Sequence, residues 1–61
     1  RVDELGDLST HESAPIRADA YHYLALTGSK NALPYLRAGL KDTDKEVQEI
    51  AQEGLETLSR L

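Results

Sequence analysis

The chain has 61 residues and a formal net charge of −4, and it contains no Cys, Met, Trp or Phe. A chain of this length forms one small domain at most, because it buries only about 60% of the surface that its unfolded form exposes, and its core must be largely aliphatic. The absence of Cys excludes a disulfide framework, a thiolate nucleophile and a zinc site made of thiolates.

Apolar residues recur at spacings of three and four along the chain, with no run of strict alternation, and this pattern predicts an all-α protein. Residues 2–9 carry the first such set, Val2, Leu5 and Leu8, which is interrupted by Gly6. We therefore expect only a short, weak helix in this segment.

The second helix is expected over residues 14–27. Ser13 is its expected N-cap, Pro15 fits the first turn, where its missing amide costs nothing, and Gly28 ends the helix. The residues expected on its inward face are Ile16, Ala20, Tyr23, Leu24 and Thr27.

The third helix is expected over residues 31–40, after a short polar link. Asn31 is preferred to Ser29 as its cap, because Asn31 places Pro34 inside the first turn, whereas Ser29 would place it where it breaks the hydrogen-bond ladder. The inner side of this helix is expected to carry Leu33, Leu36 and Leu40.

The fourth helix is expected from about Asp44 to about Arg60. The segment Thr43-Asp44-Lys45-Glu46 matches the capping box, in which the Thr hydroxyl accepts from the third helical amide and the Glu reaches back to the Thr amide. The expected apolar face contains Val47, Ile50, Ala51, Gly54, Leu55, Leu58 and Leu61, and the opposite face contains Glu46, Glu49, Glu53 and Glu56.

An offset of 31 residues aligns the second expected helix with the fourth and indicates an internal repeat. It places Ile16 on Val47, Ala20 on Ala51, Leu24 on Leu55, and the cap Ser13 on Asp44. The same offset places Val2 on Leu33 and Leu5 on Leu36, and the register then slips by one residue, so that Leu8 corresponds to Leu40. We therefore expect an inner and an outer helix in each unit, with every helix dependent on its neighbours for burial.

Three segments carry a pattern that is familiar from known repeats. They are Pro15-Ile16-Arg17-x-x-Ala20-x-x-x-Leu24, then Ala32-Leu33-Pro34-Tyr35-Leu36-x-x-x-Leu40-Lys41-Asp42, and Asp44-x-x-Val47-x-x-x-Ala51-x-x-x-Leu55. Over about residues 13–58 the chain resembles the HEAT-like repeat, in particular the short bacterial form also found in phycobilin lyases. The resemblance implies an all-α, α-α superhelix of about four helices, whose stacked pairs form a curved binding surface.

The resemblance also implies an Arg directly after the Val of the pattern, the position held here by Ile16 and Val47, and a ladder of Asp and Arg between repeats. Arg17 supplies this residue in the first copy, but Gln48 replaces it in the second, so the ladder is not expected at the last helix. The chain would hold roughly one and a half to two repeats, fewer than the three or so that such arrays normally need. Because it also lacks a starting Met, we expect a fragment, flanked by more repeats or pairing with another domain or chain, including a second copy.

No motif in the chain predicts catalysis or metal binding. His11-Glu12 lacks the second His of a zinc protease, since Pro15 stands at that position, and His22 with Asp19 has no third donor. We expect a partly exposed His22 that is hydrogen-bonded to Asp19. The four Glu residues of the fourth expected helix, which we call the acidic row, share one solvated environment, whereas general acid–base catalysis needs carboxyl groups in distinct environments. We therefore expect no enzyme activity, no cofactor and no metal.

Nucleic acid and membranes are not expected as partners. Arg17, Lys30 and Arg37 are scattered and form no basic stripe. No apolar run approaches the roughly 18 residues that a membrane span requires, and the first residues are unlike a signal peptide. We expect a soluble, cytoplasmic protein.

The second helix also has an uncharged side, made of Ala18, Tyr21, His22 and Ala25, which could be covered by adjoining repeats or by another protein. Tyr35 and Gly39 form a smaller patch of this kind, expected on the concave side. We predict a non-catalytic helical-repeat module for protein–protein interaction or scaffolding. Its predicted partner-binding residues are Tyr21, His22 and Tyr35, with a secondary acidic surface made of Glu46, Glu49, Glu53 and Glu56. The alternatives are part of a bilin lyase or isomerase-like repeat enzyme, and an accessory domain fused to a redox or signalling enzyme.

Overall fold

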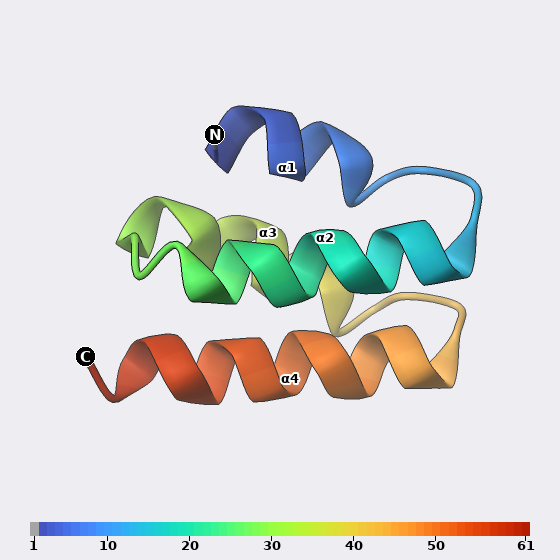
Figure 1. Cartoon of the computed structure of the whole chain (residues 1–61). Helices are drawn as coiled ribbons and strands as arrows, with labels where there is room; N and C mark the ends of the chain where they lie inside the picture. Colours follow the sequence, from blue (N-terminus) through green and yellow to red (C-terminus); the bar gives the residue numbers. More distant parts are fainter. Residues whose placement is uncertain (1) are drawn as a thin grey trace.

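The computed structural model describes residues 2–61, which form four α-helices joined by short turns (Figure 1). The helices are α1 (Val2–Leu8), α2 (Ala14–Leu26), α3 (Leu33–Gly39) and α4 (Lys45–Ser59), and a 3₁₀ turn, η1 (Lys30–Ala32), precedes α3. This part of the chain contains no strand, so the all-α prediction is confirmed. None of the helices in the described range combines the length and the apolarity that a bilayer crossing demands.

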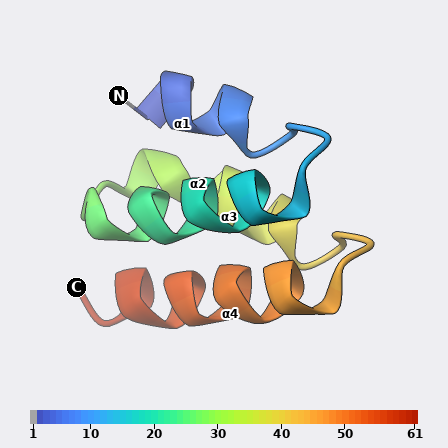
Figure 2. The same ribbon diagram turned by 45° about the vertical axis from the view of Figure 1, so that its right-hand side comes forward.

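The helices form two antiparallel pairs, α1 with α2 and α3 with α4. As a result α2 and α4 run in the same direction (Figure 1). α2 lies between α1 and α4 in both views (Figures 1 and 2), and its packing against α4 is the most extensive helix contact. This arrangement agrees with the alternation of inner and outer helices that the internal repeat predicts.

The core lies where α2, α3 and α4 meet. Its largest fully buried side chains are Leu24, Leu36 and Val47, and smaller residues allow the helices to approach closely around them. At Gly39 an added Cβ would lie 2.7 Å from the Cβ of Ala51, so α3 and α4 touch almost backbone to backbone there. The remaining members of the cluster are Tyr21, Ala32, Ala51 and Leu58.

The helix ends agree with the expected bounds, but two caps differ. Ser29, not Asn31, provides the capping side chain in this region. It caps the 3₁₀ turn that precedes α3, because its Oγ accepts from the Asn31 amide at 3.2 Å. The 3₁₀ turn absorbs the extra residues, so Pro34 still falls in the first turn of α3 and breaks no ladder. At α4 the cap is Asp44, not Thr43, and its Oδ1 accepts from the Val47 amide at 3.1 Å.

The inward face predicted for α2 is correct at two of its five positions. Ala20 and Leu24 are buried as expected, but Ile16 is 38% exposed, Tyr23 is 54% exposed, and Thr27 is exposed as well. Periodicity identifies one face of a helix, whereas α2 is covered on the sides that meet α1, α3 and α4 and is open on the remaining side. The predicted core positions Leu40 and Leu61 are also exposed, because both follow the last residue of their helices.

Candidate functional site

The two repeats are joined by an ion pair between Arg17, in the first turns of α2, and Asp42, in the loop between α3 and α4. Arg17 donates from Nε to Asp42 Oδ2 at 2.8 Å and from Nη2 to Asp42 Oδ1 at 2.9 Å, the fork geometry that suits a carboxylate. Its Nη1 also donates to the carbonyl oxygens of His11 and Glu12, at 3.0 and 2.9 Å. One guanidinium therefore holds the loop of its own repeat and the loop of the next.

This ion pair shifts the pKa values of both partners. The Arg17 guanidinium holds the pKa of the Asp42 carboxyl below its ordinary value, and the Asp44 amide, which donates to Asp42 Oδ1 at 2.8 Å, lowers it further, while burial opposes both. The hydrogen bonds to Asp42 raise the pKa of Arg17, which stays charged. The pair is structural, since its carboxyl oxygens are occupied and its side chains are only 15% and 8% exposed.

Gln48, the equivalent of Arg17 in the second repeat, makes only the local half of this contact. It donates from Nε2 to the carbonyl oxygen of Asp42, just as Arg17 donates to that of His11, 31 residues earlier. His11 stands in turn where the second repeat has Asp42, and its Nδ1 accepts from the Ser13 amide at 3.0 Å. The first repeat thus lacks the carboxylate of the ion pair, and the second repeat lacks its guanidinium.

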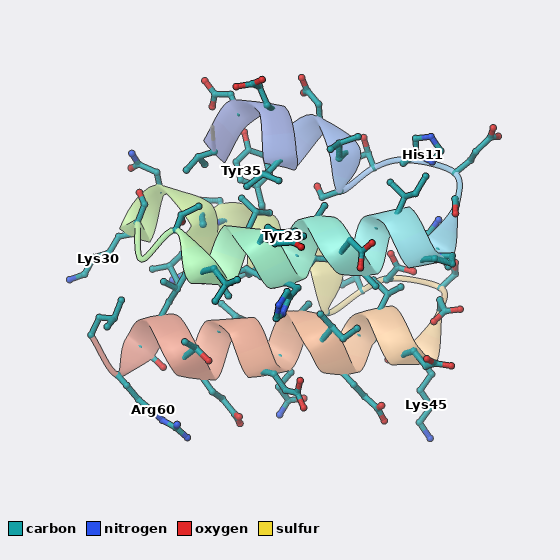
Figure 3. The ribbon with its side chains drawn as sticks, in the orientation of Figure 1. His11, Tyr23, Lys30, Tyr35, Lys45 and Arg60 are labelled. Carbon is teal, nitrogen blue, oxygen red and sulfur yellow. The ribbon has the colours of Figure 1, made fainter. Side chains whose placement is uncertain are left out.

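Tyr21 and Tyr35, which we expected on the surface, are packing residues instead. Tyr21 is 4% exposed, and its hydroxyl donates to the Ser9 carbonyl at 3.3 Å. Its ring lies against Gly39, where an added Cβ would come within 2.8 Å of Cζ. Tyr35 is half-buried beneath α1, because its ring occupies the space that a Cβ on Gly6 would need (Figure 3). The patch expected at Tyr35 and Gly39 is therefore wrong.

His22 does lie on the surface, but with a different neighbour from the one expected. Its ring makes an edge contact with Tyr23 at 5.4 Å between centroids, in place of the expected hydrogen bond to Asp19. Within residues 2–61 no three His, Asp or Glu side chains are arranged to hold a metal ion.

The acidic row lies along an exposed side of α4, and two of its members, Glu46 and Glu53, border the hollows where α4 meets α2. All four of its carboxylates are exposed, and three of them share a shallow depression with Gln52. The members of the row are Glu46, Glu49, Glu53 and Glu56. In that setting the carboxylates share water as their common environment, which gives none of them a distinct acid or base role.

An open hollow lies between α1 and α2. This open groove, of about 610 Å³, is lined by Val2, Leu5, Tyr23, Leu26 and Thr27. Tyr23 lies across the outer surface of α2, in full view in Figure 3, and Leu26 beside it is 63% exposed. We refer to these five residues together with Ile16 as the open face.

Sequence reasoning missed the open face, although a signal for it existed. Helical spacing predicts one face for Ile16, Ala20, Tyr23, Leu24 and Thr27, and the equivalents of Ile16 and Tyr23 in α4 are Val47 and Gly54. Those equivalents are indeed buried, Val47 being 1% exposed, because α2 covers them. The same positions of α2 are exposed in the described structure, and Leu26, which the predicted inward face did not include, is exposed beside them.

Comparison with known proteins gives one result. No curated protein and no solved structure matches the chain. A family model described as HEAT repeats matches residues 2–56, which is nearly the whole sequence. This match agrees with the two stacked helix pairs and with the ion pair that joins α2 to the loop between α3 and α4. The chain belongs to the HEAT repeat family.

Proposed function

We propose that the chain is a non-catalytic helical-repeat module for protein–protein interaction or scaffolding within a larger protein, and that the open face is its main contact surface. The observation that carries this proposal is the uneven distribution of exposed apolar side chains. Of the six large hydrophobic residues exposed in the described structure, four lie on α1 and α2, namely Leu8, Ile16, Tyr23 and Leu26.

Two further points support an interaction role. HEAT repeats are generally helical modules for protein interaction, and a contiguous exposed apolar patch on a small protein typically marks a contact surface. Tyr23 adds a large ring with few rotatable bonds, the kind of side chain that dominates protein interfaces. Tyr21 and Tyr35 support this surface from the interior, because they hold α2 against α3 and α3 against α1.

The acidic row, bordered by His22, remains a secondary docking surface in this proposal. His22 and Glu53 line one shallow hollow between α2 and α4, and the row continues from there along α4. A partner for it would be basic. Because the carboxylates are exposed, such binding would weaken steeply as salt is added.

The enzyme alternative ranks second. The HEAT repeat family is typically non-enzymatic, and no observation favours the bilin lyase or the fused accessory domain over an interaction module. Mixing the full-length protein with a bilin and recording its absorption spectrum tests the lyase alternative. Spectral change or covalent attachment would place that alternative first.

Photo-crosslinking in cells that produce the protein tests the proposed function. A photo-reactive amino acid at Leu26 places the probe on the open face, and the same probe at Arg37 places it on α3, outside both the open face and the acidic row, as an exposed control. We expect polypeptide adducts from the first position and few from the second. An absence of adducts at Leu26, with the chain folded and the probe active, would contradict the proposal.

A further inference from the structure

We propose that α4 closes the stack of repeats, so that the side of α4 facing away from α2 receives no further repeat of this kind and stays in water. This far side consists of Glu49, Gln52 and Glu56, which lie on the helix surface opposite Val47 and Gly54, the residues that meet α2. The chemistry of α4 itself, and not the length of the chain, opposes a neighbour there.

The equivalent residues of α2, 31 positions earlier, show what a helix needs in order to receive the next repeat. They are Ala18, Tyr21 and Ala25, and all three lie where the second repeat packs on the first. Tyr21 is 4% exposed and Ala25 is 8% exposed, and neither carries a charge. An added Cβ on Gly54 would lie only 3.1 Å from the Cβ of Ala25, so this junction has no room for a longer side chain.

A further repeat stacked on α4 in the same way would take the far side out of water. Glu56 would then be buried as Ala25 is, and Glu49 would be partly buried as Ala18 is. The residues that the second repeat places against α2, namely Gly39, Val47 and Gly54, supply no cation. An unpaired carboxylate carries a large penalty when it is buried, so a repeat with this kind of packing face is excluded from α4.

The ion pair that joins the two repeats also has no counterpart beyond α4. Arg17 makes this pair with Asp42 of the following repeat through two hydrogen bonds. Gln48 stands at the equivalent position of α4, and its amide donates to the Asp42 carbonyl of its own repeat. The carboxylate of a further repeat would therefore find no guanidinium to receive it.

The end of α4 differs from the end of α2 at the point where the chain turns into the next repeat. α2 ends at Leu26, and Gly28 follows with a φ of 65°, a left-handed conformation that other residues rarely adopt. The equivalent of Gly28 is Ser59, and α4 continues as a helix through that residue. α4 therefore lacks the turn by which α2 leads into the second repeat.

These three differences are independent of one another, since the first concerns burial, the second an ion pair and the third the backbone. In repeat proteins the terminal unit carries a polar outer face that keeps the stack in water. The far side of α4 has this character. The acidic row, which shares Glu49 and Glu56 with the far side, therefore stays accessible to solvent when the module is part of a larger protein.

The addition of a third repeat to the chain tests the proposal. A copy of residues 28–61 brings its own Gly turn, helix pair and Asp42, and joining it directly after Leu58 keeps the register in which α3 follows α2. A matched extended chain also carries the residues of α2 on the first copy of α4. Its substitutions are Gln48→Arg, Glu49→Ala, Gln52→Tyr and Glu56→Ala.

We expect the added repeat to remain unfolded on the native α4, so that the circular dichroism signal for helix equals that of the 61-residue chain. On the substituted α4 we expect this signal to rise by the contribution of α3 and α4, and the melting temperature to rise with it. Trypsin should remove the addition about tenfold faster from the first extended chain than from the second.

The control is the 61-residue chain with the four substitutions and no addition, which should keep its native helix content because three of the four positions are exposed. A third repeat that folds on the native α4 overturns the proposal. A third repeat that stays unfolded on both versions of α4 overturns it as well, because the far side and Gln48 would then not be what excludes a neighbour.

Discussion

The open face on α1 and α2 and the acidic row on α4 belong to the same two-repeat stack, yet their chemistry is opposed. One exposes large apolar side chains such as Tyr23 and Leu26, and the other exposes carboxylates in a row. In repeat proteins a stack ends in water only where its last face is polar. The residues of α2 that are equivalent to Glu49, Glu53 and Glu56 are Ala18, His22 and Ala25, which carry no carboxylate and lie on the side of α2 that meets α4.

The largest effect is expected when a carboxylate like those of the acidic row is introduced at the equivalent position of α2. Ala25 is 8% exposed and lies against Gly54, where an added Cβ would come within 3.1 Å of it. Ala25→Glu buries an unpaired carboxylate and overfills this contact, so we expect a loss on the order of 5 kcal/mol and an unfolded chain. Circular dichroism at 25 °C measures the loss of helix.

The matched control is the reverse exchange at the equivalent position, Glu56→Ala. This side chain is exposed, so we expect its removal to change the free energy of unfolding by less than about 0.5 kcal/mol. A folded Ala25→Glu chain with a normal urea midpoint would show that α2 and α4 do not pack as described.

The second effect separates two tyrosines that are two residues apart on α2. Tyr21→Ala leaves a cavity between α2 and α3 and removes a hydrogen bond to the Ser9 carbonyl, so we expect a loss of about 3 to 4 kcal/mol. Tyr23→Ala acts on the open face and should cost less than about 1 kcal/mol. Urea denaturation of both variants gives the comparison, and equal midpoints would contradict the assignment of Tyr21 to the core.

The sequence was sufficient for most of the fold because its local signals agree with one another. Pro15, Gly28 and Asp44 mark helix ends that the structure reproduces, and the 31-residue offset predicted the stacking of α2 on α4. The site was harder to predict. Tyr21 and Tyr23 exchanged their expected roles, because helical periodicity defines faces and does not say which faces have a neighbour.

The third effect concerns the ion pair that joins the repeats. The folded pKa of Asp42 is lowered, so its contribution to stability is present above the ordinary aspartate pKa of 3.8 and is lost as the pH falls through the lower folded value. Arg17 has a raised pKa, and its contribution would be lost only in strong alkali. We expect Asp42→Asn to lower the melting temperature by several degrees at pH 7.

The same variant should also flatten the acid end of the stability curve. Once the pH falls below the lowered folded pKa of Asp42, the native chain loses the ion pair as well, so the melting temperatures of the two chains should converge there. Melting curves measured at several pH values make the comparison. A difference that stays constant down to the most acidic pH would mean that Asp42 acts through packing or its hydrogen bond to the Asp44 amide, and not through its charge.

The smallest effect is expected from giving the second repeat the residue that the first one uses. Gln48→Arg supplies a guanidinium, but the carboxylate that Arg17 meets belongs to the next repeat, and α4 is followed by none in the described structure. Its Nη1 can still reach the Asp42 carbonyl, so we expect a change within about 0.5 kcal/mol. The reverse exchange, Arg17→Gln, breaks a made pair and should lower the melting temperature clearly. Equal and opposite shifts in the two variants would show that the guanidinium stabilises its own loop rather than the junction between repeats.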